Sequence, residues 1–311
     1  MRWVSYTAAD GGPRAGLVHG DEIHGLPAPT RVLDLLGDDG TRMAEAAERA
    51  LADPVEVLPY AGAVLLPPVA PPAVRDFLTF LDHMRVVQDA TGVTMSEVWE
   101  QIPFFYFSNP AAVVGPHDPV AISPGCSWFD FELEVAAIIG RAGRDLDPET
   151  ATEHIAGFTV FNDWSARDLQ LHEMKLNSGP AKGKDGANTL GPMLVTPDEL
   201  EPHRSGGSYR LRMSAHVNGE YVGGGLLDQM DWTWGEMLAY ASRGTTLRPG
   251  DALGSGTVPT GCLIEHFATA PDTFRGWLRP GDVVRLEVEQ LGAIEQRVLP
   301  APPVHRLRTG F

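Results

Sequence analysis

The chain has 311 residues, of which 43% are hydrophobic and 21% are charged, and its formal net charge is -17. These proportions are typical of a globular protein. The excess of acidic side chains argues against nucleic acid and anionic membranes as partners, because both attract a basic surface. A small anionic substrate remains compatible with this charge, since a bound metal ion and a few cations can reverse the sign within one pocket.

No segment approaches the roughly 20 consecutive apolar residues that span a bilayer, and the first residues lack the apolar run of a signal peptide. We therefore expect a cytoplasmic protein without membrane contact. The two cysteines, Cys126 and Cys262, fit neither a disulfide framework nor a Cys-x-x-Cys metal or redox motif. Both are expected to be buried free thiols.

The first 70 residues predict a small β-rich unit. Two short strands are expected around the Gly20-Asp21 turn, and an Ala- and Glu-rich stretch over residues 41–52 favours a helix. Residues 65–72 read Leu-Leu-Pro-Pro-Val-Ala-Pro-Pro, a stiff connector typical of a domain boundary. We therefore expect an N-terminal domain over residues 1–70 and a larger domain over residues 71–311.

The larger part predicts mostly strands, and its many Gly and Pro residues favour turns over long helices. Strands are predicted over residues 113–114, 133–139, 157–161, 193–195, 209–217 and 283–290. Helices are predicted over residues 80–90, 165–174 and 234–242. The phrase Leu-Arg-Pro-Gly-Asp occurs at residues 247–251 and 278–282, where Pro-Gly predicts a type II turn that leads into a strand.

The first candidate site residues follow the connector. Asp76 comes directly after it, and His83 lies seven residues later, about two turns along if the segment is helical. A single histidine is more often structural than catalytic, so the pattern alone assigns no role to His83.

Three acidic residues then alternate at the start of a hydrophobic stretch: Asp130, Glu132 and Glu134 precede Val-Ala-Ala-Ile-Ile. Alternate residues of a strand point to one face, so these carboxylates are expected to project together. Burying like charges is costly unless they are neutralised, and a divalent cation with oxygen ligands is the simplest neutraliser. A solvated edge strand is the alternative, but it should stay polar on one face, which residues 135–139 do not.

Another acidic element follows the strand predicted over residues 157–161. Asp163 lies at the end of that strand, where side chains often face a cleft, although capping the next helix would also explain it. Arg167 and Gln170 lie three residues apart, and a helix would place them on one face.

Two glycine-rich loops come next. Residues 181–186, Ala-Lys-Gly-Lys-Asp-Gly, form a basic loop around Lys184 in an acidic chain. Residues 254–265 form another, which contains Thr257 and ends at Glu265. This loop matches neither G-x-G-x-x-G nor a Walker A motif, so the sequence gives little support to a nucleotide-binding function.

These elements, in this order, resemble the fumarylacetoacetate hydrolase family. The resemblance rests on Phe-Glu-Leu-Glu before an Ile-Ile-Gly strand, Asn-Asp-Trp-Ser-Ala-Arg-Asp-Leu-Gln, the Lys-Gly-Lys-Asp loop, Val-Asn-Gly-Glu, and Leu-x-Pro-Gly-Asp before a Gly-Thr loop, and it covers roughly residues 72–300. It implies a mixed α+β, β-rich fold: a β-roll catalytic domain preceded by the small N-terminal β-domain that many members carry. Members are commonly homodimers, so a homodimer is expected here.

The resemblance implies a role for each candidate residue. Metal ligands are matched by Asp76, Glu132, Glu134 and Asp163, which leaves Asp130 outside the ligand set. His83 matches the catalytic histidine, Glu265 the carboxylate that orients it, and Lys184 the lysine near the substrate oxygen. Substrate contacts are matched by Arg167, Gln170, Tyr106 and Thr257. Leu78 stands where fumarylacetoacetate-specific members tend to have a tyrosine, so the resemblance does not fix the substrate.

An all-oxygen ligand set favours a hard cation, Mg²⁺, with Mn²⁺ or Ca²⁺ as alternatives. The resemblance implies hydrolysis of a C–C bond in a small anionic 1,3-diketo or 2-oxo acid, of the fumarylacetoacetate or acylpyruvate type. His83 and Glu265 would activate water, and the metal would stabilise an enolate.

Two alternatives stay open. Related members decarboxylate 2-oxo acids, or isomerise or hydrate 2-hydroxydienoates, on the same metal site; decarboxylation and isomerisation need no activated water, so the presence of both His83 and Glu265 favours hydrolysis. The alternative of another class is a non-catalytic metal-binding protein on this scaffold, which predicts the loss of a ligand or of the base. All of the expected groups are present.

Overall fold

The computed structural model of the chain describes residues 1–91 and 96–309. Its α-helices are α1 (Thr41–Ala52), α2 (Leu81–Thr91), α3 (Arg167–Glu173), α4 (Pro197–Leu200), α5 (Trp234–Ala241) and α6 (Leu263–Thr269). Within these two ranges, none of the helices combines the length and the apolar composition that crossing a membrane requires.

Strands make up most of the regular structure, so the chain has the mixed α+β, sheet-rich fold that the sequence predicts. They are β1 (Arg2–Thr7), β2 (Pro13–His19), β3 (Glu22–Gly25), β4 (Val57–Pro59), β5 (Leu65–Leu66), β6 (Val74–Phe77), β7 (Phe105–Ser108), β8 (Val113–Val114), β9 (Val120–Ala121), β10 (Phe129–Asp130), β11 (Leu133–Ile139), β12 (Gly143–Arg144), β13 (Ile155–Asp163), β14 (Ser165–Ala166), β15 (Asn188–Val195), β16 (Arg204–Ser205), β17 (Ser208–Tyr209), β18 (Arg212–Val217), β19 (Glu220–Leu226), β20 (Thr246–Leu247), β21 (Ala252–Gly254), β22 (Val283–Val288) and β23 (Gly292–Leu299).

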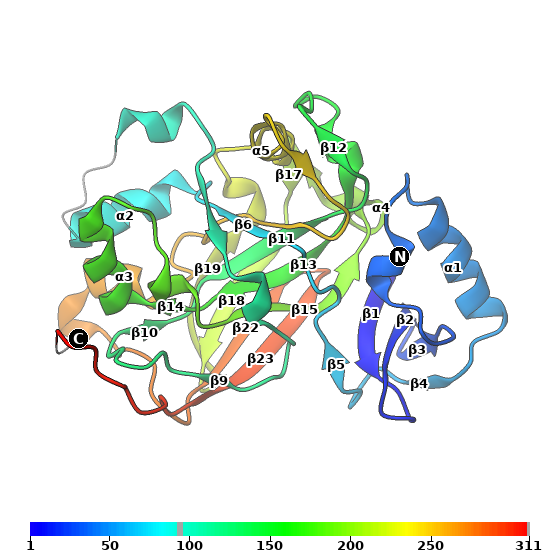
Figure 1. Cartoon of the computed structure of the whole chain (residues 1–311), viewed down its shortest axis with the longest axis horizontal. Coiled ribbons are helices and arrows are strands. Elements are labelled where there is room, and N and C mark those ends of the chain that lie inside the picture. Colours follow the sequence, from blue (N-terminus) through cyan, green and yellow to red (C-terminus); the bar gives the residue numbers. More distant parts are fainter. Residues whose placement is uncertain (92–95, 310–311) are drawn as a thin grey trace.

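Two sheets form the body of the molecule. In the 12-stranded sheet the order β4-β3-β2-β1-β15-β13-β11-β21-β6-β7 runs from the N-terminal lobe into the body, with β5 beside β1 and β8 beside β15. The 5-stranded sheet has the order β19-β18-β22-β23-β9. Strands β22 and β23 pack against β13 and β15, and β18 contacts β11, so the body is layered around a shared core (Figure 1).

Strand β11 lies at the centre of this body. All seven of its residues are buried, because β13 and β21 flank it and the 5-stranded sheet lies against it. Its Val, Ala and Ile side chains suit a strand without a solvated face. The structure therefore confirms the buried-strand interpretation of residues 133–139 over the edge-strand alternative.

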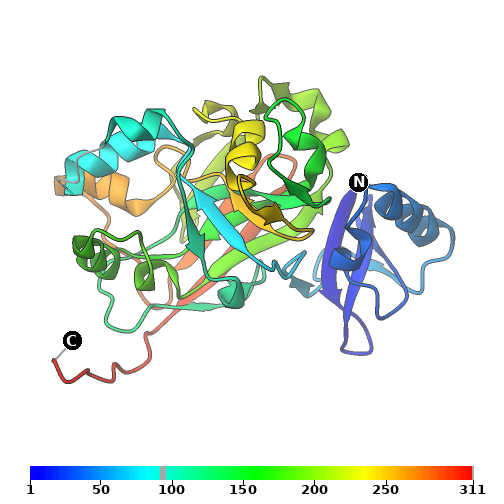
Figure 2. The ribbon, with the colours of Figure 1, turned by 45° about the horizontal axis from the view of Figure 1, so that its top comes forward.

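The N-terminal lobe, residues 1–70, extends the large sheet of the body. Strand β1 pairs antiparallel with β15, where Trp3 lies opposite Leu194. Trp3 and Met43 of the lobe share an apolar core with Leu194 and Ile138 of the body. Figure 2 shows the lobe, in dark blue, at one end of the molecule. Backbone pairing and apolar packing thus both join the two parts.

Most predicted elements are present, with shifted ends. Helix α1 and strand β11 agree with their predictions residue for residue. The strand predicted over residues 209–217 is interrupted, since β17 ends at Tyr209 and β18 begins at Arg212. The helix predicted from Ser165 begins at Arg167, because β14 occupies residues 165–166 and pairs with β10.

Both Leu-Arg-Pro-Gly-Asp phrases form the predicted turns. Gly250 and Gly281 have φ values of 89° and 96°, which the third residue of a type II turn requires. In each turn the backbone N–H of the following Asp donates to the carbonyl of the Arg, at 3.0 Å. The turns lead into β21 and β22, as expected.

We expect Trp3→Ala to destabilise the protein by about 3–5 kcal/mol, because the indole is fully buried in the core that the lobe shares with the body. Urea denaturation followed by circular dichroism measures the change. Val64→Ala, at an exposed position in the same lobe, is the control and should alter stability by less than about 0.5 kcal/mol. An early transition of the lobe alone, with the main transition unmoved, would contradict this coupling.

Candidate active site

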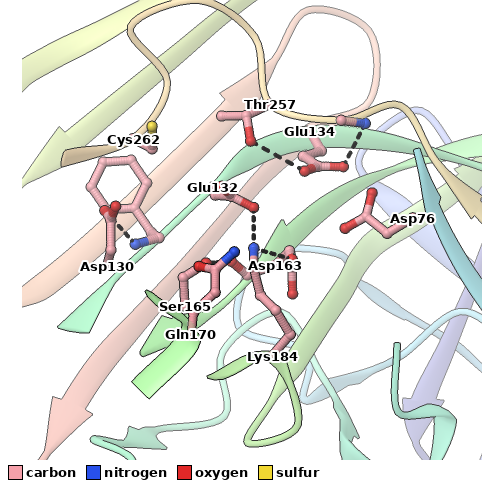
Figure 3. Close-up of polar contacts among 12 residues, drawn as sticks. Asp76, Asp130, Glu132, Glu134, Asp163, Ser165, Gln170, Lys184, Thr257 and Cys262 are labelled. Atoms are coloured by element: carbon pink, nitrogen blue, oxygen red, sulfur yellow. Dashed lines mark hydrogen bonds and ion pairs between the residues drawn. The ribbon is translucent and has the colours of Figure 1, made fainter. Parts of the chain in front are cut away.

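Four buried carboxylates come together from three strands of the large sheet. Asp76 lies in β6, Glu134 in β11 and Asp163 at the end of β13, while Glu132 directly precedes β11. The strand order β13-β11-β21-β6 brings these positions side by side. Figure 3 shows the four side chains in one region of the body.

Lys184 and Tyr106 link the four carboxylates into one network. The Lys184 ammonium forms ion pairs with both Glu132 and Asp163. The Tyr106 hydroxyl donates to Asp76 Oδ2 at 2.8 Å and also contacts Asp163 Oδ2. The carboxyl of Asp76 in turn contacts the carboxyl of Glu134 in β11, which completes the set of four.

The four carboxylates are neighbours, but they do not form a group whose ligand atoms all lie within 4.8 Å of one another. In the described part of the chain, one group of three potential metal ligands meets this distance criterion. It consists of His83, Cys262 and Glu265. The positive charge that lies between Glu132 and Asp163 is the ammonium group of Lys184. The assignment of the four carboxylates as ligands of one metal ion therefore stays a prediction.

Burial and mutual repulsion alter the acidity of these groups. Removal from water is the largest cause that raises the pKa of Asp76, Glu134 and Asp163 above its ordinary value, and neighbouring carboxylates add to it. Burial also acts to raise the pKa of Glu132, but the guanidinium and ammonium groups beside it hold that pKa below its ordinary value. Only when more than two of the four carboxyls are ionised would their negative charge exceed that of the two cations, Arg167 and Lys184.

The donor set fits a hard divalent cation. Asp76 Oδ1 and Asp163 Oδ1 are buried and have no hydrogen-bond partner. A buried oxygen without a partner is costly, so both atoms are suited to a ligand. All the donors are oxygens, and carboxylate oxygens are what Mg²⁺, Mn²⁺ and Ca²⁺ prefer.

The loop after β21 supports this cluster in a way that the sequence did not reveal. The backbone N–H of Gly256 donates to Glu134 Oε2 at 2.8 Å, and the Thr257 hydroxyl donates to Oε1 at 3.4 Å. A Cβ atom at Gly254 would lie 2.5 Å from Asp76 Oδ1 and 3.0 Å from Glu134 Oε2. Glycine is therefore required at position 254, because any side chain there would occupy the space of the Asp76 and Glu134 carboxylates. The close approach follows from the pairing of β21 with both β6 and β11.

Asp130 has a different role from the other acidic residues of its segment. It accepts hydrogen bonds from the backbone N–H groups of Leu263 and Ile264, at 2.7 and 3.1 Å, and so caps the start of α6. Its carboxylate also pairs with Arg167 Nε at 2.9 Å. Arg167 Nη2 pairs with Glu132 at 2.7 Å, so one guanidinium joins two of the three alternating carboxylates. Both oxygens of Asp130 are thus engaged by α6 and Arg167, and its exclusion from the metal ligands stays a prediction.

His83 and Glu265 meet where α2 packs on α6. His83 Nδ1 contacts Glu265 Oε1, and the other carboxylate oxygen, Oε2, accepts from the backbone N–H of Thr260 at 2.7 Å. The carboxylate therefore fixes the orientation of the ring. Because Nδ1 is engaged, Nε2 is the nitrogen available for proton exchange in the cavity that His83 lines.

A cavity of about 460 Å³ connects these groups to solvent. Of the eleven predicted site residues, six line it: His83, Tyr106, Glu132, Arg167, Gln170 and Lys184. The other five are buried and are not part of that lining: Asp76, Glu134, Asp163, Thr257 and Glu265. The structure thus gathers all eleven predicted residues in one region, and their individual roles stay predictions.

The chain matches known proteins over most of its length. The family model described as "Fumarylacetoacetate (FAA) hydrolase C-terminal" matches residues 73–299. The human protein named "Oxaloacetate tautomerase FAHD2A, mitochondrial" is 33% identical over 309 residues, which cover 96% of this chain and 92% of the relative. The Xenopus laevis protein named "Oxaloacetate tautomerase fahd2, mitochondrial" is 31% identical over 310 residues, with coverage of 96% and 90%.

A solved structure supports the same relationship. The structure titled "Fumarylacetoacetate hydrolase (EaFAH)", from Exiguobacterium antarcticum, superposes with a TM-score of 0.73 at 27% identity and covers 96% of this chain and 99% of that one. Both relatives above are named as mitochondrial proteins, so they do not support the cytoplasmic location that the sequence suggested.

We expect Gly254→Ala to weaken Mg²⁺ binding by about 10- to 100-fold, because the added methyl group would displace the carboxyls of Asp76 and Glu134. Isothermal titration calorimetry measures the affinity. Gly179→Ala, where a Cβ atom meets nothing within 4 Å, is the matched control. Wild-type affinity in a folded Gly254→Ala protein would show that these two carboxyls do not hold the ion.

Proposed function

Since the chain belongs to the fumarylacetoacetate hydrolase family, we propose that it is a metal-dependent enzyme that hydrolyses a C–C bond in a 2,4-dioxo acid of the acylpyruvate type. The observation that carries this proposal is the buried His83–Glu265 pair, whose histidine lines the same cavity as Glu132 and Lys184. A histidine oriented by a carboxylate is the arrangement that activates water.

The metal would be held by Asp76, Glu132, Glu134 and Asp163, whose oxygen donors suit it. When bound, the ion supplies Lewis-acid polarisation of the 2-oxo acid oxygens and so favours negative charge on them. The two relatives named as tautomerases, like the hydrolase structure, belong to the same family and fit an enzyme of this general kind.

His83 acts as the general base. Its Nδ1 proton points to Glu265, which leaves the lone pair of Nε2 free to accept a proton from water in the cavity. The resulting hydroxide adds to the carbonyl at C4 of the substrate. When the C3–C4 bond breaks, its electron pair remains on C3 as an enolate, and His83 returns the proton to C3. Water is thereby consumed, and a carboxylic acid and a 2-oxo acid are released.

Lys184 stabilises negative charge during this reaction. Two of its ammonium hydrogens are directed to Glu132 and Asp163, and an ammonium group has three. The third can donate into the cavity toward the oxygen that becomes negative. Its strong pairing keeps it charged: burial acts against the charge, but Asp163 and Glu132 raise its pKa above the ordinary value for lysine.

Arg167 and Gln170 would position the substrate. The guanidinium donates to Asp130, Glu132 and Gln170 through one hydrogen on each nitrogen, so two of its five N–H groups remain for a substrate carboxylate. Tyr106 and Thr257 contact Asp76 and Glu134 of the proposed metal site. Both would therefore meet the substrate close to the metal.

Proton transfer without bond cleavage is the second candidate. Both relatives are named oxaloacetate tautomerases, and a keto–enol tautomerase needs the same acid–base residue but no attacking water. Two assays separate the candidates: release of pyruvate from acetylpyruvate, and disappearance of the ultraviolet absorbance of enol-oxaloacetate. Turnover of enol-oxaloacetate with no cleavage of any 2,4-dioxo acid would replace hydrolysis by tautomerisation.

We expect His83→Ala to lower kcat by about 10²- to 10⁴-fold with Mg²⁺ affinity nearly unchanged, because the general base is lost while the carboxylates remain. Steady-state kinetics and calorimetry measure the two quantities. His19→Ala, at an exposed position in the N-terminal lobe, is the control. Loss of Mg²⁺ binding in His83→Ala would instead place His83 among the metal ligands.

We expect Mg²⁺ binding to release protons and to tighten as the pH rises. The pKa values of Asp76, Glu134 and Asp163 are raised, so these carboxyls keep their protons to a higher pH than ordinary carboxyls do, and a metal ligand must lose its proton. Calorimetry in two buffers of different ionisation enthalpy counts the protons released. Equal apparent enthalpies in both buffers would contradict the assignment of these carboxyls as ligands.

A further inference from the structure

The cavity has two chemically different walls. The six predicted site residues named above form a polar wall on the side of the carboxylate cluster. The apolar part of the lining, called the apolar wall below, comes from four separate segments of the chain, and the polar residues Gln88, Asn177 and Ser178 also line the cavity. The main residues of the apolar wall are Leu78, Met84, Val87, Trp99, Phe104 and Leu171.

Three of these six apolar residues lie on helices that also carry proposed site residues. Met84 and Val87 follow His83 on α2, and Leu171 follows Arg167 by one helical turn on α3. Trp99 and Phe104 pack on each other with ring centroids 5.5 Å apart. Figure 1 shows α2 and α3 on the same side of the body. The apolar wall and the proposed site residues His83 and Arg167 therefore share α2 and α3.

The positive charge in this cavity is already neutralised. Arg167 forms ion pairs with Asp130 and Glu132, and Lys184 with Glu132 and Asp163. Among the described residues that line the cavity, these two are the only lysine or arginine side chains. The sequence between the described ranges, residues 92–95, contains no lysine, arginine or histidine.

A substrate with a second carboxylate at its far end would thus meet apolar side chains there. That carboxylate would lose water without gaining a cation, which is unfavourable. An aliphatic or aromatic group of the same length would instead remove its own apolar surface, and that of the wall, from water.

From this arrangement we infer that the enzyme selects 2-oxo acids whose far end is apolar and uncharged, and discriminates against those that end in a second carboxylate. The inference rests on the proposed function, since it assumes that the 2-oxo acid end binds at the carboxylate cluster. The preferred substrates are then 2,4-dioxo acids with an alkyl or aryl acyl group. Leu78, where a tyrosine was expected for fumarylacetoacetate-specific members, is part of the wall that makes this selection.

A matched pair of ligands tests the inference by binding alone. 2-Oxohexanoate and 2-oxoadipate have the same chain length and differ in the terminal carboxylate. Calorimetry with the Mg²⁺-loaded protein should show 2-oxohexanoate bound more tightly by roughly tenfold or more. In the series from 2-oxobutanoate to 2-oxohexanoate, each methylene should tighten binding about fourfold, the equivalent of about 0.8 kcal/mol.

A charge placed on the apolar wall should invert this preference. Leu171→Arg adds a cation without a carboxylate partner, so 2-oxoadipate should gain affinity over 2-oxohexanoate relative to the wild type. Leu51→Arg makes the same substitution at an exposed site on α1 of the N-terminal lobe and should leave the preference unchanged. The wild-type comparison decides the matter even if Leu171→Arg does not fold.

The outcomes separate this inference from the function on which it rests. If both ligands bind and acetylpyruvate is cleaved, but 2-oxoadipate binds as tightly as 2-oxohexanoate, only the apolar selection is overturned. If neither ligand binds the Mg²⁺-loaded protein and no 2,4-dioxo acid is turned over, both are overturned.

Discussion

The structure depends on a buried surplus of acidic groups over basic ones. Five carboxylates, those of Asp76, Asp130, Glu132, Glu134 and Asp163, are buried in one region with only two cations, Arg167 and Lys184. Such a surplus is costly in the interior of a protein, and it persists here because the flanking strands of the large sheet fix the side chains that carry it. Burial, together with repulsion between neighbouring carboxylates, raises the pKa of three of these carboxyls, those of Asp76, Glu134 and Asp163. A bound divalent cation would neutralise these acidic groups and so remove part of the free-energy cost of burying them. That free energy would contribute to the affinity for the ion.

Sheet and helices divide the work of the site. The large sheet positions most of the acidic groups, whereas α2, α3 and α6 carry the proposed acid–base pair, the guanidinium of Arg167 and part of the apolar wall. Chemistry common to the family would belong to the sheet, and the shape and polarity of the wall would decide which substrate is accepted. The different names of the relatives, tautomerases and a hydrolase on one fold, fit this division.

An Ala- and Glu-rich composition predicted the helix of the lobe, and an unbroken run of apolar residues predicted the buried strand. Alternation correctly placed Glu132 and Glu134 near each other, but it could not show that Asp130 caps α6, since that contact joins residues more than 130 positions apart. The resemblance supplied the distant pairs, such as His83 with Glu265. Neither source indicated that Gly254 must lack a side chain or that Lys184 bridges two carboxylates, because both facts follow from strand register and loop packing.

Asp130 also has a consequence for how the two halves of the site communicate. One carboxylate holds both the first turn of α6, which carries Glu265, and the guanidinium of Arg167 on α3. A ligand that pulled the guanidinium away would release part of the anchor of α6, and the histidine partner would shift with it. Binding of a ligand at Arg167 would thereby affect the proposed general base, His83, through the single shared side chain of Asp130, without any movement of the sheet beneath.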